Sequence, residues 1–384
     1  YYQIARCFRD EDLRADRQPE FTQVDVEMSF MTTDEIIEVG ENMVAKVVKD
    51  VKGVDVKLPL PRMTWREAME TYGIDKPDIR FDMKLVNLNE VVKDVDFMVF
   101  KSALENNGYV KGINVKNHAS DYSRKKIDQL TELAKTYKAK GLAWLKVNNG
   151  VGEGPIAKFF SEEQMQRLIE AMNGEDNDLL LFVSDTKYMV VCDALAALRN
   201  HLGKELNLYD PKELGLLWVV DFPMFEYDDE TQRYYAMHHP FTAPKEDGLE
   251  LLETDPSKVC ARAYDMVLNG NEVGGGSIRI NNPELQQRMF KALGFTEQDA
   301  QERFGFLIDA FRYGAPPHGG MAFGLDRLVM LMLGGESIRD VIAFPKVANS
   351  SELMTSSPST VDEKQLVELG IAVCKQEQSE ETID

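Results

Sequence analysis

A strict alternation of apolar and polar residues runs through residues 21–30. Its apolar positions are Val24, Val26, Met28 and Phe30, and its other positions are Phe21, Gln23, Asp25 and Glu27. Successive side chains of a strand point to opposite faces, so this pattern predicts a strand with one face in a core. The opposite face then presents an amide and two carboxylates in a row. The aromatic and β-branched stretch at residues 1–8 predicts a partner strand.

A long loop, residues 9–20, joins these two strands and carries both signs of charge. A simple hairpin closes with about two to five turn residues, so we expect the longer loop to fold over a charged ligand. An antiparallel ribbon with one solvated face is the alternative explanation of the same polar pattern. Arg9 shares the parity of Gln3, Ala5 and Cys7, which would place it on the polar face as well.

A second pattern lies in residues 314–335, where a Gly/Pro turn leads through a short apolar run into a stretch of helical period. The helical positions, spaced i, i+3, i+4, i+7 and i+8, are Leu325, Leu328, Val329, Met332 and Leu333. The pattern predicts a buried strand that runs into a buried helix ending at Gly334. Asp326 and Arg327 lie at the junction. Either the helix dipole explains Asp326 and solvent contact explains Arg327, or the helix N-terminus and the guanidinium together bind a polyphosphate.

The same reasoning assigns elements to the rest of the chain. Helices are predicted over residues 32–51, with Thr33 as a cap, and over 64–72, 123–137, 161–172, 193–202, 258–268, 283–292, 296–310 and, weakly, 362–377. Strands are predicted over residues 97–100, 108–115, 142–147, 179–183, 188–191 and 216–225, with a strand-like Gly-rich run at 269–280. The last residues of the polar tail are expected to lack fixed structure.

In residues 81–206 predicted strands and predicted helices alternate, unlike in the rest of the chain. This alternation predicts an inserted α/β or α+β domain of usual size. The whole chain is therefore expected to be α+β, with one domain built from residues 1–80 and 207–384, the latter including the tail, and a second domain inserted at 81–206.

Composition narrows the class of protein. The 384 residues are 43% hydrophobic and 28% charged, as in ordinary soluble proteins, and no apolar run approaches the length of a membrane span. The net charge of −21 argues against a basic nucleic-acid-binding domain, although it permits a local RNA contact. The four cysteines have no CxxC spacing, so a reducing cytoplasm is expected. Because the chain starts without Met inside a predicted strand, we expect an N-terminal part to lie outside it.

Charged residues surround the Gly-rich run in the second half of the chain. Glu272 and Arg279 flank three glycines that weaken a strand and allow a ligand or a second backbone to approach. Asp265 precedes them, and two carboxylates near a polyphosphate site suggest Mg²⁺. His238 and His239 are adjacent, so on a regular strand they would face opposite ways, and a metal pair is not expected. One of them is a candidate pocket contact, with packing or solvation as the alternative.

Several of these stretches together resemble one family. Residues 8–23 resemble motif 2 of class II aminoacyl-tRNA synthetases in their bacterial-type aspartyl form, and residues 324–327 resemble motif 3. Residues 238–241 and 272–279 resemble the aspartyl-group signatures between those motifs, and residues 81–206 are similar to the family's GAD insertion domain. The resemblance implies an antiparallel sheet flanked by helices. The family's anticodon-binding domain, its motif 1 dimer interface and its substrate-binding lysine loop have no counterpart here, so a homodimer is expected through a region outside this chain.

The resemblance also implies an activity. L-aspartate and ATP would give aspartyl-adenylate, and the aspartyl group would pass to the terminal adenosine of tRNA(Asp). A non-discriminating form that also charges tRNA(Asn) and a tRNA-independent paralogue remain as alternatives. Without the motif 1 region and the lysine loop, this chain alone is expected to be poorly active.

The resemblance carries over a set of site residues. The implied catalytic residues are Arg9 and Arg327, with Arg9 on the α-phosphate and Arg327 on the γ-phosphate. The implied ATP contacts are Arg9, Asp10, Glu11, Gln18, Gln23, Glu272, Gly324, Leu325, Asp326 and Arg327. The implied aspartate contacts are Arg9, Asp25, His238 and Arg279, and the implied Mg²⁺ ligands are Asp265 and Glu272. Arg279 would pair bidentately with the side-chain carboxylate of aspartate.

Overall fold

A seven-stranded sheet with the strand order β1-β2-β14-β13-β12-β9-β3 combines strands from both ends of the chain. The computed structural model describes residues 1–10 and 12–374. Described neighbours in this sheet pair antiparallel, apart from the parallel pair β3–β9. The strands are β1 Tyr2–Phe8, β2 Glu20–Ser29, β3 Arg62–Thr64, β9 Leu216–Val220, β12 Ala263–Leu268, β13 Asn271–Ile278 and β14 His318–Gly324.

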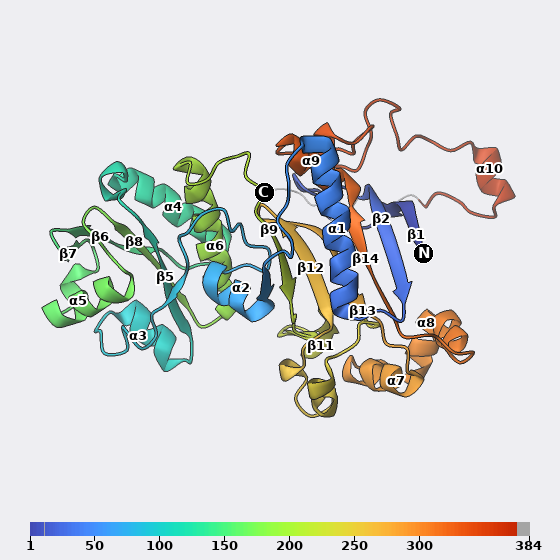
Figure 1. Cartoon of the computed structure of the whole chain (residues 1–384), viewed down its shortest axis with the longest axis horizontal. Helices are drawn as coiled ribbons and strands as arrows, with labels where there is room; N and C mark the ends of the chain where they lie inside the picture. The colour runs from blue at the N-terminus through green and yellow to red at the C-terminus, as the bar shows by residue number, and fades with distance from the viewer. Residues whose placement is uncertain (11, 375–384) are drawn as a thin grey trace.

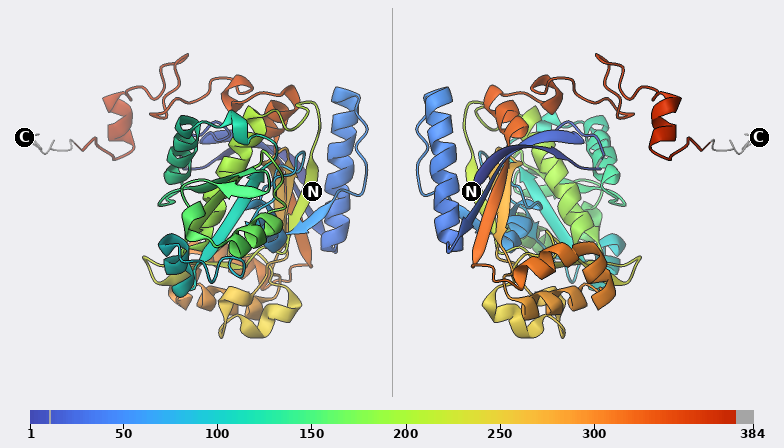
Figure 2. Two further views of the ribbon diagram at one scale, coloured as in Figure 1. Left: turned by 90° about the vertical axis from the view of Figure 1, so that its left-hand side faces the viewer. Right: turned by 90° about the vertical axis from the view of Figure 1, so that its right-hand side faces the viewer.

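Helix α1 (Thr33–Lys52) lies along one face of this sheet (Figures 1 and 2). Thr32, and not the predicted Thr33, is its N-cap and forms a capping box with Glu35. The apolar side of α1 joins the core that surrounds Trp218 of β9. The predicted alternation holds for Val24 and Met28, which pack against this core, but it is wrong for Phe30, which lies beyond the end of β2 and is exposed. The opposite face of the sheet is left for polar side chains.

A second sheet with the order β4-β5-β8-β6-β7 forms the inserted region, which stands beside the first sheet in Figure 1. Its strands are β4 Val86–Asn87, β5 Tyr109–Val115, β6 Ala143–Asn148, β7 Val151–Glu153 and β8 Leu179–Asp185. Its helices are α3 Met98–Glu105, α4 Arg124–Thr136, α5 Glu162–Ala171 and α6 Tyr188–Glu205. All pairings found in it are antiparallel, so the insertion is α+β in type and not the parallel α/β alternative.

Polar bonds join the two sheets through α2 (Trp65–Tyr72). The fully buried Lys111 of β5 donates to Glu70 of α2 at 2.7 Å. Arg199 of α6, also fully buried, donates to four backbone carbonyls of the segment that follows α2, those of Asp78, Phe81, Asp82 and Met83. The insertion is therefore attached by hydrogen bonds as well as by the chain itself.

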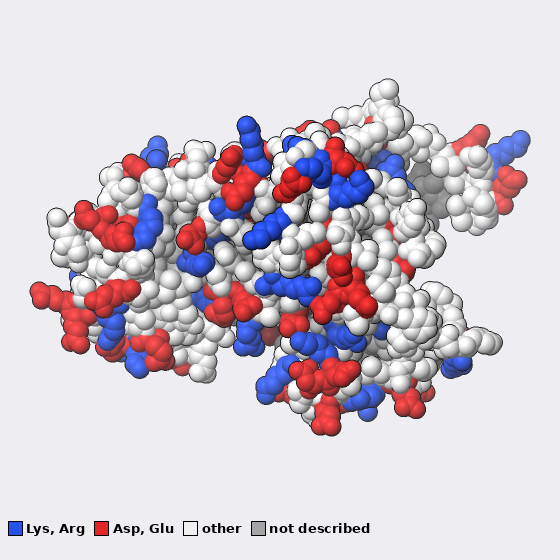
Figure 3. Space-filling model, viewed as in Figure 1, with Lys and Arg blue, Asp and Glu red and all other residues white. Residues whose placement is uncertain are grey.

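The remaining elements surround the end of the main sheet. They are the hairpin of β10 (Phe225–Asp228) and β11 (Arg233–Ala236), the helices α7 (Pro283–Ala292) and α8 (Glu297–Phe311), α9 (Leu325–Leu333) after β14, and α10 (Glu363–Glu368). Figure 2 shows α10 projecting away from both sheets. On the face seen in Figure 3, acidic and basic residues are interspersed. No helix within the described ranges is long and apolar enough to cross a membrane.

Three predicted elements are wrong in type. Residues 97–100 belong largely to α3, residues 188–191 are the first turn of α6, and the predicted helix at 258–268 is a short 3₁₀ turn followed by β12. Short apolar runs fit a buried strand and a buried helix equally well, because periodicity cannot separate them. The helix predicted at 362–377 is the shorter α10, and residues 375–384, where we expect no fixed structure, lie outside the described residues.

Candidate active site

Beside the polar face of β2, the next strand β14 presents small residues on the same face. We call this surface, formed by Gly320, Ala322 and Gly324 with their partners on β2 and β13, the floor of the site. Gln23, Asp25 and Glu27 lie opposite Gly324, Ala322 and Gly320 of β14. On the other side of β14, Gly275 and Ser277 of β13 lie opposite Ala322 and Gly320. Because paired residues of neighbouring strands share a face, the polar side chains of β2 and β13 stand on either side of a strand that has almost no side chains there. A ligand can lie on this floor.

Two glycines let acidic side chains lie across the floor. A Cβ on Gly275 would come within 2.2 Å of Asp265 Oδ1, and a Cβ on Gly320 would come within 2.5 Å of Glu27 Cδ. Both positions therefore need glycine for the carboxylates to reach over the neighbouring strand. The predicted close approach at the Gly-rich run is thus made, at Gly275, by a side chain of the protein itself.

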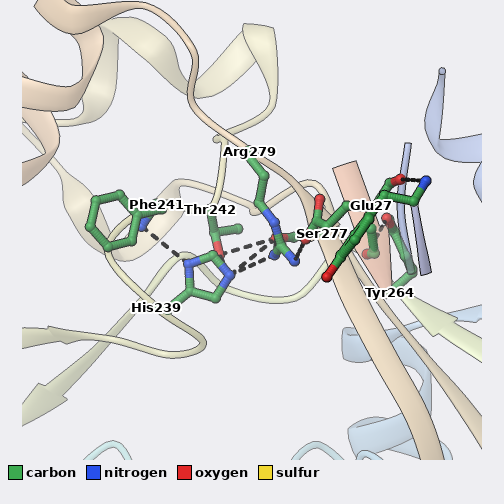
Figure 4. Close-up of polar contacts among 9 residues, drawn as sticks. Glu27, His239, Phe241, Thr242, Tyr264, Ser277 and Arg279 are labelled. Carbon is green, nitrogen blue, oxygen red and sulfur yellow. Dashed lines mark hydrogen bonds and ion pairs between the residues drawn. The ribbon is translucent and has the colours of Figure 1, made fainter. Parts of the chain in front are cut away.

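Arg279 is held at both ends of its guanidinium group (Figure 4). Its NH2 donates to Glu27 Oε1 at 2.7 Å. Its NH1 donates to Ser277 Oγ at 2.6 Å and to His239 Nε2 at 2.7 Å. Arg279 keeps only 19% of its side-chain surface exposed. Sequence reasoning identified Arg279 but missed these three partners.

His239 contacts Arg279, and His238, which was predicted to contact aspartate, does not bond this arginine; the aspartate contact of His238 stays a prediction. The two histidines follow β11 in an irregular bend, so the opposite-face argument for a regular strand does not apply to them. Arginine can only donate, so His239 Nε2 must accept and the ring must be neutral. Burial and the charge of Arg279 lower the pKa of His239 to about 4, which agrees with a neutral ring.

His238 lies between the arginine and the acidic side of the site. Its Nε2 is 4.0 Å from Asp265 Oδ2, and its ring meets Phe222 edge-on with centroids 4.8 Å apart. Burial lowers the pKa of His238, while the charge of Glu272 opposes that shift. Its buried Nδ1 has no hydrogen-bond partner in the described part of the chain. A buried polar atom without a partner is one that a ligand can satisfy.

The predicted acidic pair is joined by a third carboxylate. Burial, then the charges of Glu272 and Asp75, raise the pKa of Asp265 well above its usual range. Asp75 comes from the loop after α2, which was predicted only as a loop, and burial raises its pKa too. Within residues 1–10 and 12–374 no group of three or more His, Cys, Asp or Glu is arranged to hold a metal. The concentrated negative charge at Asp265 and Glu272 nevertheless fits Mg²⁺, which uses one or two carboxylates together with substrate phosphates.

Most of the predicted nucleotide contacts line one cavity of about 90 Å³. Its predicted members are Arg9, Gln18, Gln23, Glu272, Gly324, Asp326 and Arg327. Arg327 NH1 donates to the backbone oxygen of Glu272 at 2.6 Å, and its NH2 donates to that of Asp16 at 3.1 Å. The loop that we expected to fold over a ligand therefore closes onto the start of α9.

Gln18 holds the loop in place. Its side chain is 1% exposed, donates to the Lys346 carbonyl at 3.1 Å and accepts from the Lys346 N–H at 2.7 Å. Of the other predicted contacts, Asp10 is exposed, Leu325 is the first residue of α9, and Asp25 stands on the floor between Gln23 and Glu27. Glu11 lies outside the described residues.

The largely antiparallel sheet brings Arg279, Arg327 and the acidic residues Asp265 and Glu272 onto one group of neighbouring strands and the helix that follows β14. An antiparallel sheet flanked by helices is what the motif resemblance implies. The chain matches the family model described as tRNA synthetases class II (D, K and N) over residues 1–348, and it belongs to that family.

Relatives of known name are close in sequence. The chain is 60% identical over 371 residues to an aspartate–tRNA ligase of Macrococcus caseolyticus (strain JCSC5402), covering 97% of this chain and 62% of that protein. It is 58% identical over 378 residues to an aspartate–tRNA(Asp/Asn) ligase of Bacillus mycoides (strain KBAB4), covering 98% and 64%. The chain thus spans less than two thirds of their length. An Entamoeba histolytica asparaginyl-tRNA synthetase structure is more distant, with 16% identity and a TM-score of 0.46 over 92% of this chain and 53% of that one.

Proposed function

We propose that this chain is the greater part of an aspartate–tRNA ligase, which converts L-aspartate and ATP to aspartyl-adenylate and pyrophosphate and passes the aspartyl group to tRNA(Asp). The names of the relatives and the family membership support the reaction class. The choice of aspartate as the amino acid rests on one observation, the N–H groups of Arg279 that have no partner among the described residues.

Arg279 has five N–H donors, and three of them are used inside the protein. Both donors of NH1 go to Ser277 and His239, and one of NH2 goes to Glu27. The two that remain, the Nε–H and one N–H of NH2, have no hydrogen-bond partner in the described parts of the chain. We propose that they lie on the Nε/NH2 edge of the guanidinium and pair bidentately with the aspartate carboxylate. The side-chain amide of asparagine offers one acceptor and one donor group, so it leaves an N–H of Arg279 unpaired, which costs affinity.

The activation step brings anions together, so it depends on fixed positive charge. An oxygen of the aspartate α-carboxylate bonds to the α-phosphorus of ATP as the bond to the pyrophosphate oxygen breaks. We propose that Arg9 stabilises the α-phosphate and the attacking carboxylate, and that Arg327 binds the γ-phosphate. Asp265 and Glu272 would hold Mg²⁺, which would supply charge neutralisation between phosphate oxygens. Because the attacking group is already an anion, this step needs no general base.

Binding of ATP requires local exchange of partners. Arg327 NH2 is bonded to the backbone of Asp16, and the Asp16 carboxylate lies 3.5 Å away. We propose that a phosphate replaces Asp16, while Gln18 stays bonded to the backbone of Lys346. Gln23 and the exposed Asp10 would then contact ATP, and Glu11, Gly324, Leu325 and Asp326 would complete its surroundings as expected from the resemblance. Asp25 and His238 would contact aspartate beside Arg279.

The test is aspartate-dependent exchange of pyrophosphate into ATP by the full-length protein. We expect exchange with aspartate and at most trace exchange with asparagine, and loss of the aspartate-dependent signal in Arg279→Ala. Absence of exchange with aspartate in the intact protein would rule the proposal out and favour a tRNA-independent paralogue or a binding module.

A second candidate, a ligase that also charges tRNA(Asn), is supported by the Asp/Asn name of the Bacillus mycoides relative. Aspartylation of purified tRNA(Asp) and tRNA(Asn) by the full-length protein separates the two forms, since only the broader form charges both. We also propose a homodimer formed through the region outside this chain, which sedimentation of the full-length protein checks. The four cysteines, all free thiols, suit the cytoplasmic location that we propose.

A further inference from the structure

Glu27 and Ser277 stand two strands apart on the floor, with Gly320 between them. The register pairs Glu27 with Gly320, and Gly320 with Ser277, so the two polar side chains start about 10 Å apart, or two strand spacings. The guanidinium of Arg279 spans this gap by bonding both of them. Arg279 itself follows the end of β13, so its side chain has to turn back over the floor to do so.

We propose that Glu27 and His239 are positioning residues that fix the free edge of Arg279 and thereby set the preference for acid over amide. This inference rests on the proposed function and adds to it the origin of the selectivity. Glu27 holds one end of the guanidinium and His239 holds the other, so the plane cannot rotate about Nε without breaking a charge-assisted or short hydrogen bond. Preorganising a binding group in this way removes an ordering cost from ligand binding.

A competing role for Glu27 is that of an internal carboxylate that blocks Arg279 until aspartate displaces it. The hydrogen bonds argue against blocking, because Glu27 accepts one N–H of NH2 only and has no bond to the Nε–H. Its second oxygen, Oε2, is buried and has no hydrogen-bond partner among the described residues. A carboxylate placed to block would engage the guanidinium with both oxygens, as aspartate is proposed to do.

The geometry also requires a neutral acceptor at His239. Ser277 and Thr242 contact the same ring nitrogen at 3.4 Å, so its surroundings are hydroxyls and the guanidinium, and none of them is a carboxylate. A glutamine at this position keeps a carbonyl acceptor, whereas an alanine removes it. The same pair of replacements is available at Glu27, where glutamine keeps an acceptor oxygen at the same reach and removes the charge.

The experiment compares Glu27→Ala with Glu27→Gln in the full-length protein by pyrophosphate exchange. In Glu27→Ala we expect the KM for aspartate to rise by about tenfold or more, the size expected for loss of one charged hydrogen bond. The KM for ATP and kcat should change less than threefold, and the ratio of kcat/KM for aspartate over asparagine should fall. Glu27→Gln should restore part of the loss, since it keeps the acceptor oxygen but not the charge.

Three results would overturn the proposal: an unchanged KM for aspartate in Glu27→Ala, a lowered KM, as a blocking carboxylate predicts, or a Glu27→Gln variant as impaired as Glu27→Ala. If Glu27→Ala does not fold, His239→Ala is compared with His239→Gln. We expect a higher KM for aspartate in His239→Ala and partial recovery in His239→Gln, and the three opposing results are the same as for Glu27. Failure here is distinct from failure of the proposed function, because the unaltered protein would still show aspartate-dependent exchange.

Discussion

The carboxylate of Asp326 accepts a hydrogen bond from the backbone N–H of Thr22 at 2.6 Å, across 304 positions of sequence. Asp326 stands in the first turn of α9, where its charge also favours the helix dipole. The helix-dipole explanation for this charge therefore applies, polyphosphate binding stays a prediction, and the bond to Thr22 adds a further role. The bond connects the beginning of β2, which carries Gln23, to the first turn of α9, which carries Arg327.

Replacing Asp326 by Ala should therefore weaken both the fold and the nucleotide site. We expect a loss of about 1–3 kcal/mol in the free energy of unfolding, because the partly buried Thr22 N–H is left without a partner. Urea unfolding followed by circular dichroism measures this loss. Asp326→Asn is the matched control, since it keeps an acceptor oxygen, and equal destabilisation by both replacements would contradict the prediction.

Replacing Arg327 should impair use of ATP. We expect Arg327→Ala to lower kcat/KM for ATP by at least about 100-fold in pyrophosphate exchange, because a fixed cation on the transferring phosphates is lost. Arg327→Lys should recover only part of that loss, since lysine cannot donate from a planar fork. Arg312→Ala is a matched control from the exposed end of α8, and it should behave as the unaltered protein.

The neutral state of His239 predicts a dependence of stability on pH. Its pKa falls from about 6.5 in the unfolded chain to about 4 in the folded protein, so the unfolded chain binds the proton more tightly. The stability contributed by the neutral ring is present above pH 6.5 and is lost as the pH falls from about 6.5 to about 4. The loss amounts to about 3 kcal/mol for a shift of this size.

Urea unfolding between pH 4 and pH 7 measures this effect. His238, whose pKa is also lowered, contributes to the same curve, so the test is the difference between the unaltered protein and His239→Gln. We expect a shallower dependence in His239→Gln. Parallel curves would show that His239 does not take up a proton on unfolding in this range.

The acidic pair predicts that Mg²⁺ stabilises the protein even without substrates. At pH 8 we expect Asp265→Asn to be more stable than the unaltered protein in EDTA, by roughly 1 kcal/mol, because a carboxyl group whose charged form is disfavoured by burial, and then by the charge of Glu272, is removed. We expect millimolar Mg²⁺ to raise the melting temperature of the unaltered protein and to have a smaller effect on Asp265→Asn. Differential scanning calorimetry measures these melting temperatures without an activity assay. An equal Mg²⁺ effect on both proteins would place the metal elsewhere.

Local patterns predicted most elements of the fold correctly. The alternation at residues 21–30 became β2, and the helical spacing after Gly324 became α9. Predictions from local patterns were wrong where a strand is buried on both faces, because the alternation of apolar and polar residues is then lost. In β12, almost every residue of Ala263–Leu268 is buried, so the run reads as continuously apolar and was taken for a helix. The antiparallel type of the inserted sheet was also open, since strand order is not a local property.

The sequence by itself determined which side chains could do chemistry here and on which face of their strand they lie. Gln23, Asp25 and Glu27 share a face because the side-chain period of a strand is two, whatever the strand packs against. Only the tertiary structure decided which of these meets Arg279. The partner is Glu27, 252 positions away, and the choice of His239 over His238 follows from an irregular bend after β11. Strand register and loop path bring such residues together, and both depend on the packing of the whole sheet.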